Sequence, residues 1–214
     1  MTPIILIARI VWSAGLDFAL AGSFLITWIA PETFGERTVH KFTFMMLLEF
    51  LVVHSTGFFG AIGARDATLR ARVLQYGLLL GFYCLFAAAF SASYGGPWPL
   101  IAFVVLTLNK LPNVVIRPPD SDAQMVVMAN WAIMTALYLG GVFLTVMYPV
   151  PPLGITPEVI TRQQFDVGGL WPEEPYRVMA FGAFYFAGMG VVSLLNELIP
   201  FLHGRRRARR GARE

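Results

Sequence analysis

Six long apolar runs dominate this 214-residue chain and restrict the folds open to it. They cover approximately residues 4–30, 42–63, 73–94, 98–116, 125–148 and 176–201. A helix needs about 17–25 apolar residues to cross the hydrocarbon layer of a bilayer, and each run reaches that length. Only 14% of the residues are charged, whereas a soluble domain carries about 25%. We therefore predict an all-α, polytopic integral membrane protein, a bundle of six transmembrane helices.

The fourth run, 98–116, is the weakest of the six because polar residues interrupt its second half. Lys110 follows Asn109, and Pro112 cannot donate a backbone hydrogen bond to the helix. One interpretation is a broken helix at a functional site, since freed carbonyl groups at membrane depth need partners. The other is that Lys110 extends to the cytoplasmic interface. A five-span protein with a half-inserted fourth segment is a further alternative.

The distribution of basic residues predicts the orientation of the spans, because arginine and lysine collect in cytoplasmic loops. Loops 64–72 and 117–124 and the C-terminal tail are basic, whereas the loop 149–175 contains four acidic residues and one arginine. This alternation fits six spans with both termini in the cytoplasm and the 149–175 loop outside it. An odd number of spans would break the alternation.

The chain divides into a membrane domain, residues 1–203, and a basic cytoplasmic tail, residues 204–214. The tail contains six arginines, while the whole chain has a formal net charge of only +3. The rest of the chain is therefore net negative, which argues against nucleic acid as a partner. A basic segment beside a span attracts anionic lipid at about 1 kcal/mol per residue. We expect the lipid bilayer to be a partner, with anionic headgroups at Arg205–Arg213.

Ionisable residues within the apolar runs are the candidate functional groups, because a charge at the bilayer centre costs roughly 2.5–3.5 kcal/mol. In the first span, Arg9, Ser13 and Asp17 follow at intervals of four residues and share one face of a helix. This polar stripe either makes structural hydrogen bonds to neighbouring helices or lines a cavity. The central position of Asp17 in the run is the argument for the cavity.

The second span contains Glu49 and His54. Their spacing separates the two side chains by about 140° around a helix, so they cannot face one partner. Antiparallel packing of the first two spans would place Asp17 and His54 at similar depth, and we predict that these two residues form a pair. That pair is either a structural ion pair or a proton relay. Glu49 faces another direction, and the sequence names no partner for it.

Two further sets of residues concern the packing of the bundle. Arg9 and Glu197 fall near the cytoplasmic ends of the first and last spans, and we predict an ion pair between them. Small residues at helical spacing permit close approach of helices, within the bundle or with another subunit. The residues concerned are Gly15, Ala19 and Gly22 in the first span, Gly77 and Gly81 in the third, and Ala183 and Ala187 in the sixth.

The sequence predicts no cofactor. A haem held by two histidines within one chain needs both of them deep in the membrane, but His40 and His203 lie at the ends of spans and only His54 is deep. A structural zinc site needs a cluster of cysteine and histidine, and the chain contains one cysteine, Cys84. Nucleotide-binding and hydrolase motifs are also absent from the sequence.

The 149–175 loop is the one long segment between spans. Thr156, Pro157 and Glu158 have the pattern of a helix start, which combines a capping hydroxyl, a proline at the first helical position and an early acid. We predict a short helix over residues 157–165 within this loop.

Two functional classes stay open on the sequence alone. The first is a small transporter or channel-like protein whose internal polar pathway contains Ser13, Asp17, Glu49, His54 and Lys110. The second is a structural or accessory subunit of a larger membrane complex, or a homo-oligomer, joined through its glycine faces and the long loop. An intramembrane enzyme is a third class with less support, because Glu49 and His54 do not converge on one substrate.

Overall fold

The computed structural model describes residues 3–63, 68–94, 96–97, 99–101, 103–104, 121–165 and 168–211. Within those residues the chain is helical and contains no strand. The long helices are α1 (Pro3–Ile29), α2 (Thr38–Gly63), α3 (Leu69–Tyr94), α5 (Ser121–Met147) and α8 (Pro175–Gly211), and the short ones are α6 (Pro157–Gln163) and α7 (Leu170–Glu173). The prediction of an all-α fold is confirmed for this part of the chain.

Four helices are long and apolar enough to cross a membrane, counted over the described residues. The spans are Thr38–Ile62 in α2, Leu69–Ala92 in α3, Met128–Met147 in α5 and Pro175–Ile199 in α8. In α1 the apolar stretch found, Ala14–Ile29, is shorter. Most of the predicted fourth span, 98–116, lies outside the described residues. The count of six therefore stays a prediction.

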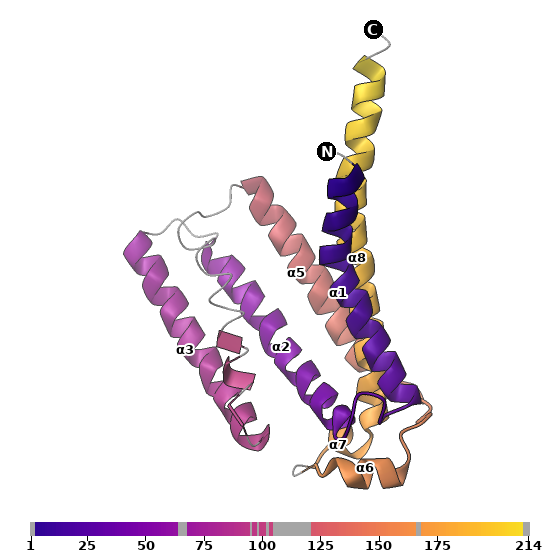
Figure 1. Cartoon of the computed structure of the whole chain (residues 1–214). Helices are drawn as coiled ribbons and strands as arrows, with labels where there is room; N and C mark the ends of the chain where they lie inside the picture. The colour runs from indigo at the N-terminus through magenta and orange to yellow at the C-terminus, as the bar shows by residue number, and fades with distance from the viewer. Residues whose placement is uncertain are drawn as a thin grey trace.

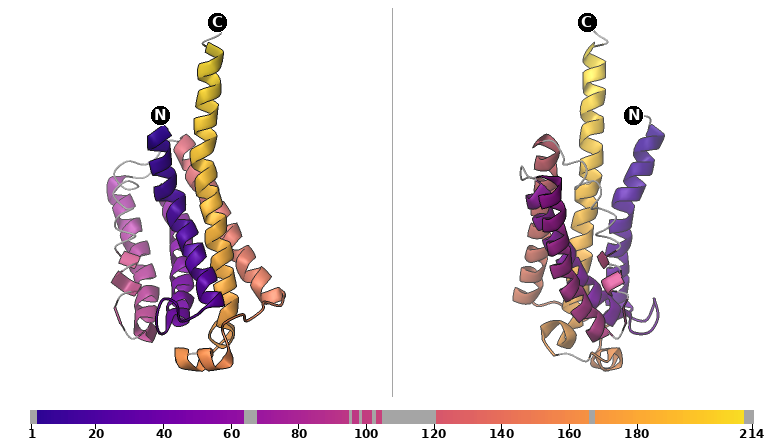
Figure 2. Two further views of the ribbon diagram at one scale, coloured as in Figure 1. Left: turned by 45° about the vertical axis from the view of Figure 1, so that its right-hand side comes forward. Right: turned by 90° about the vertical axis from the view of Figure 1, so that its left-hand side faces the viewer.

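The long helices lie side by side, and most neighbouring pairs are antiparallel (Figure 1). α1 begins and α8 ends at one end of the bundle, and α6 and α7 lie at the opposite end. α8 packs along α1 and also contacts α5 and α2, whereas α3 lies at the edge of the bundle against α2. Both views in Figure 2 show α8 continuing beyond the other helices. α2 and α8 are therefore the helices on which a central site would be built.

Glycines of α8 allow α1 to approach closely. A Cβ atom at Gly182 would overlap the ring of Phe24, and a Cβ atom at Gly190 would come within 2.8 Å of the Phe18 ring. Phe24 is fully buried. Large rings on α1 thus occupy the space that side chains would fill on α8, which explains why this pair of helices has the most extensive contact in the bundle.

The glycines predicted to mark close packing have no near neighbour from another helix among the described residues. A Cβ atom at Gly22, Gly77 or Gly81 would meet no other atom within 4 Å. At Gly15 the nearest atom belongs to its own helix, at 3.9 Å. Close packing at these glycines, within the bundle or with another subunit, therefore stays a prediction.

The predicted alanines behave differently from one another. Ala19 is exposed on α1 and Ala187 is partly buried on α8. Ala183 is partly buried and packs against the main core.

Hydrogen bonds from aromatic side chains tie α5 to the backbone of α2. Trp131 Nε1 donates to Val53 O at 3.0 Å, and the Tyr138 hydroxyl donates to Met46 O at 2.8 Å. Gly57 leaves room for the first of these bonds, since a Cβ atom there would overlap the Trp131 indole. Bonds of this kind satisfy aromatic donors in a membrane without water.

The main buried core joins α8 to α1, α2, α5 and α6. Its residues come from α1, α2, α5, α6, α8 and the loop before α6, and they are Phe24, Val39, Met46, Val53, Tyr138, Ile155, Val159, Val178, Met179, Phe181, Tyr185 and Phe186. A smaller cluster of Leu51, Tyr83, Ala87 and Phe103 joins α3 to α2. The larger cluster therefore stabilises the surroundings of any site between α2 and α8.

Arg177, at the start of α8, connects that helix to the end of α5. Its guanidinium donates to the carbonyl oxygens of Thr145 and Tyr148 and pairs with Glu174. The last carbonyl groups of a helix lack intrahelical partners, and a cation there is favourable. The hydrogen bond from Arg177 also lowers the pKa of the Glu174 carboxyl. The angle between α5 and α8 is thereby fixed at this end.

The short helix predicted in the long loop is present. Thr156 is its N-cap and accepts from the backbone of Val159, and Pro157 opens the helix. Hydrogen bonding with Thr156 lowers the pKa of Glu158. The Glu158 carboxylate lies in the first turn of the helix, where the helix dipole favours a negative charge. The helix ends at Gln163, two residues earlier than predicted, because Gln164 adopts a left-handed conformation with φ of 50°.

Residues 149–165 and 168–174, which we call the cap, fold back onto the end of α1. Trp28 Nε1 donates to Pro151 O at 2.9 Å, and Gly154 N donates to Trp28 O at 3.1 Å. Ile155 follows directly and is buried in the main core. The cap is therefore an integral part of the bundle and closes one of its ends.

Candidate functional site

Glu49 lies at mid-depth in the bundle and faces α8. The Tyr185 hydroxyl donates to Glu49 Oε1 at 2.7 Å. Tyr185 is fully buried, and Glu49 is partly buried. Counted from the start of α2, Glu49 is about 16 Å along the helix, near the middle of the apolar span Thr38–Ile62. The Glu49 carboxylate, for which the sequence indicated no partner, thus accepts a hydrogen bond from a hydroxyl of α8.

Buried aromatic rings surround this pair on the α5 side. The Tyr138 ring lies edge-on to the Tyr185 ring with centroids 5.6 Å apart, and Phe181 packs edge-on against Tyr138 at 4.8 Å. Tyr138 is 3% exposed, and its hydroxyl proton is directed to Met46 O. The rings separate the Glu49–Tyr185 hydrogen bond from bulk water on this side.

Asp17 also faces α8, from the other direction. Ser193 Oγ donates to Asp17 Oδ2 at 3.0 Å. Ser193 is two turns beyond Tyr185, about 12 Å further along α8. One helix therefore supplies hydroxyl groups to two carboxylates carried by two other helices. We call Asp17, Glu49, Tyr185 and Ser193 the carboxylate track.

The predicted pair of Asp17 and His54 is not formed. His54 lies on the exposed side of α2, and its ring packs against Phe50 with centroids 4.3 Å apart. The reason is the position of α1, which packs along α8 and has little contact with α2. The predicted divergence of Glu49 and His54 around α2 is confirmed, since Glu49 faces α8 and His54 is exposed.

Several predicted residues fall outside what the structure describes. Lys110 is outside the described residues, as are the side chains of Arg9 and Ser13. Glu197 lies on α8 and is partly buried. The Arg9–Glu197 ion pair and the contributions of Ser13 and Lys110 to a polar pathway stay predictions.

Tyr138 and Tyr185 are the site residues that the sequence reasoning missed. Both are tyrosines in the middle of apolar runs. A buried tyrosine hydroxyl needs a hydrogen-bond partner, so two such residues at mid-span indicate acceptors nearby. That signal was present in the sequence, but it does not identify the acceptor.

A second polar cluster joins the cap to the start of α2. Gln163 Oε1 accepts from His40 N at 3.1 Å, while Arg37 Nε donates to Gln163 O at 3.3 Å. Arg37 Nη2 lies 2.9 Å from His40 Nδ1, and since a guanidinium only donates, that nitrogen accepts. The junction thus caps both helices: Gln163 caps the N-terminus of α2, and Arg37, which directly precedes α2, caps the C-terminus of α6.

We expect Gln163→Met to lower the free energy of unfolding by about 2 kcal/mol, because it leaves the buried His40 N–H without its acceptor. Gln164→Asn is the matched control, since the Gln164 side chain is exposed and asparagine tolerates a left-handed backbone. Unfolding by SDS titration in mixed micelles, followed by circular dichroism, measures both. Equal stability of the two variants would show that the Gln163 amide does not stabilise the junction.

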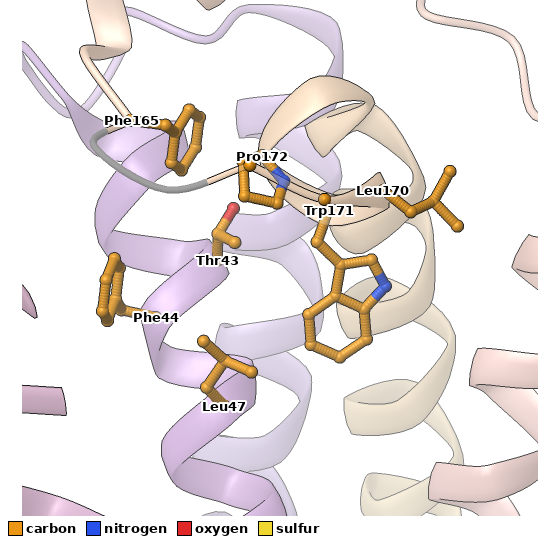
Figure 3. Close-up of a pocket in the computed structure, with 9 residues that line it drawn as sticks. Thr43, Phe44, Leu47, Phe165, Leu170, Trp171 and Pro172 are labelled. Carbon is orange, nitrogen blue, oxygen red and sulfur yellow. The ribbon is translucent and has the colours of Figure 1, made fainter. Parts of the chain in front are cut away.

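A cavity of about 330 Å³ lies between α2 and α7, beside this junction. Figure 3 shows Thr43, Phe44 and Leu47 on α2 facing the cap residues, and the lining from the cap is Phe165, Gly168, Gly169, Leu170, Trp171 and Pro172. The lining is almost entirely apolar and contains no residue of the carboxylate track. The cavity is suited to an apolar group and is separate from the ionisable site.

The described residues contain no group of three or more His, Cys, Asp or Glu side chains that could hold a metal ion. Comparisons with protein-family models, with curated proteins and with solved structures find no significant match to this chain. The geometry of the carboxylate track is therefore the basis for a functional proposal.

Proposed function

We propose that the protein is a small membrane transport component whose polar pathway follows the carboxylate track along α8. One observation carries the proposal: Glu49 and Asp17 face a single helix from two others, and Tyr185 and Ser193 donate hydroxyl hydrogen bonds to them. Six spans, cytoplasmic termini and contact of the Arg205–Arg213 tail with anionic lipid headgroups belong to the same proposal.

The physical argument concerns the free energy of burying two carboxylates in a membrane. An ionised acid at mid-membrane costs roughly 2.5–3.5 kcal/mol on insertion scales. A bundle that needed only polar contacts between helices would form them with serine, threonine or asparagine at a lower cost. Ionisable groups that face a bundle interior are typical of ion and proton pathways. The two carboxylates also lie at different depths, as successive binding sites along a pathway would.

We expect the purified chain in lipid vesicles to move ions, and Asp17→Asn/Glu49→Gln to lose most of that flux. Charge movement on a solid-supported membrane, recorded while single ions are exchanged, measures this for a series of ions. Glu36→Gln is the control, because Glu36 is an exposed acid in the turn between α1 and α2. Equal ion flux in the wild type and the double variant would contradict the proposal. The absence of ion flux from both proteins would also contradict it.

A structural or accessory subunit is the second candidate function, and one observation favours it. Gly77 and Gly81 lie on an exposed face of α3, and a Cβ atom at either would meet no other atom within 4 Å. Such a face admits a second helix closely. If this candidate is correct, Gly77→Leu/Gly81→Leu shifts the protein from a large complex to its own size in native gels of solubilised membranes. An unchanged gel position would argue against it.

A further inference from the structure

We infer that the ion bound by the carboxylate track is the proton and that Glu49 is its binding group. The inference rests on the proposed transport function and narrows it to one substrate class. It is carried by the juxtaposition of the Glu49 carboxylate with the Tyr185 hydroxyl at 2.7 Å, with buried aromatic rings on the α5 side.

The Tyr185 hydroxyl is compatible with both protonation states of Glu49. When Glu49 is ionised, the hydroxyl donates to Oε1. When a hydronium ion delivers a proton, one O–H bond forms on a carboxylate oxygen, one O–H bond of the hydronium breaks to leave water, and Tyr185 keeps its own proton. A hydroxyl can donate or accept in the new arrangement. Proton binding therefore neutralises the site without requiring the hydrogen-bonded pair to separate.

The two carboxylates of the track are poorly placed to share a metal cation. A hard cation such as Ca²⁺ takes six to eight oxygen ligands. Asp17 and Glu49 accept hydrogen bonds from Ser193 and Tyr185, which are about 12 Å apart along α8, so the two carboxylates do not enter one coordination shell. A proton needs a single carboxylate oxygen, and each carboxylate of the track supplies one.

Asp17 is a second proton-binding group and does not share a proton with Glu49. Their partners on α8, Ser193 and Tyr185, are about 12 Å apart along the helix, whereas a direct hydrogen bond spans about 2.5–3.2 Å. A proton that passes from one carboxyl to the other therefore travels through water or by movement of a side chain. Each carboxyl is expected to titrate as its own group.

The test uses the full chain in lipid vesicles with a potassium gradient, valinomycin and an internal pH-sensitive dye. We expect the wild type to carry protons in response to the potential, and Glu49→Gln to fall to the rate of empty vesicles. Glu49→Asp keeps a carboxyl and should retain proton flux with a shifted pH profile. Glu36→Gln, in an exposed turn, should behave as the wild type.

A matched pair of tyrosine variants examines the hydrogen bond itself. Tyr185→Phe should slow proton flux and change its pH profile, because the hydroxyl that orients Glu49 is lost. Tyr83→Phe removes another buried hydroxyl, on α3 and outside the track, and should leave both unchanged. Equal effects of the two variants would overturn the role given to Tyr185.

Infrared difference spectra supply a readout that does not depend on flux. As the pH is lowered, a carboxylic acid band should appear in the wild type. The same band should not appear in Glu49→Gln. A Glu49 carboxyl that stays ionised throughout would overturn the inference. Glu49-dependent flux of sodium or potassium, without proton flux, would also overturn it and leave the transport function standing. No flux of any ion would overturn both.

Discussion

Gly182→Ala is expected to lower the free energy of unfolding by about 1–3 kcal/mol, the usual range for overpacking a buried site. The added methyl group would overlap the Phe24 ring, which is fully buried. That ring cannot swing away freely, because Phe42 and Phe186 pack against it with centroids 4.6 and 5.6 Å away. The helices α1 and α8 must therefore separate locally.

Gly22→Ala is the matched control for this prediction. Gly22 lies in α1, within the same helix pair, but a Cβ atom there meets no other atom within 4 Å. Alanine in a helix interior is favoured over glycine by roughly 0.5–1 kcal/mol, so this variant should be as stable as the wild type or more so. Unfolding by SDS titration followed by circular dichroism compares the two. Destabilisation of the same size in both would contradict the structure.

A double variant separates steric overlap from other effects of the substitution. Phe24→Leu is expected to be destabilising alone, because it removes buried ring atoms. Combined with Gly182→Ala, it should cost less than the sum of the two, with a coupling energy of about 1 kcal/mol. Additive effects would show that the two residues do not share the space.

The helical spans could be predicted from sequence because a helix needs a minimum length of apolar residues to cross the hydrocarbon layer. The length of an apolar run can be read directly from the sequence. The predicted run 42–63 corresponds to the span Thr38–Ile62, and 73–94 to Leu69–Ala92. The start of α6 was predictable for a local reason, since Thr156 satisfies a backbone donor at the helix N-terminus. Neither of these two predictions depends on which helices are neighbours.

Helix neighbours were harder to predict, and the candidate site depends on them. Consecutive spans were expected to pack, which paired Asp17 with His54. In the structure α1 packs along α8, so Asp17 meets Ser193 and Glu49 meets Tyr185, 136 residues away in sequence. A helical wheel gives the angle between side chains on one helix but not the rotation of that helix against its neighbours.

The glycines illustrate the same limit. Gly22 and Gly182 look equivalent in sequence, since each lies in an apolar run. Only the structure shows that an aromatic ring fills the space beside Gly182 and that the space beside Gly22 is open. Stability differences of opposite sign are therefore expected from two substitutions that a sequence pattern would treat alike.

Gly154→Ala is expected to have the largest effect of any single glycine substitution on the attachment of the cap. A Cβ atom at Gly154 would overlap Ile29 O and lie 2.8 Å from Ile29 C and 3.0 Å from Pro31 Cδ. The obstacle is backbone, so a change of rotamer cannot relieve it. We expect a loss of about 3 kcal/mol, at the upper end of the range for overpacking.

The structural consequence should be local to the cap. To admit the methyl group, the chain at Gly154 must move away from α1, which breaks the hydrogen bond from Gly154 N to Trp28 O. The bond from Trp28 Nε1 to Pro151 O depends on the same approach. Ile155 would also leave the main core. Hydrogen exchange followed by mass spectrometry should therefore show faster exchange over the cap, with α3 unchanged.

Gly168→Ala supplies the control within the same loop. A Cβ atom at Gly168 has Glu173 Oε1 as its nearest neighbour at 3.8 Å, an ordinary van der Waals distance. The substitution should leave exchange over the cap close to the wild type. If Gly154→Ala and Gly168→Ala gave the same exchange, the close approach of the cap to α1 would be refuted. If Gly154→Ala alone accelerates it, α1 and the cap form one packed unit that closes the end of the bundle nearest Glu49.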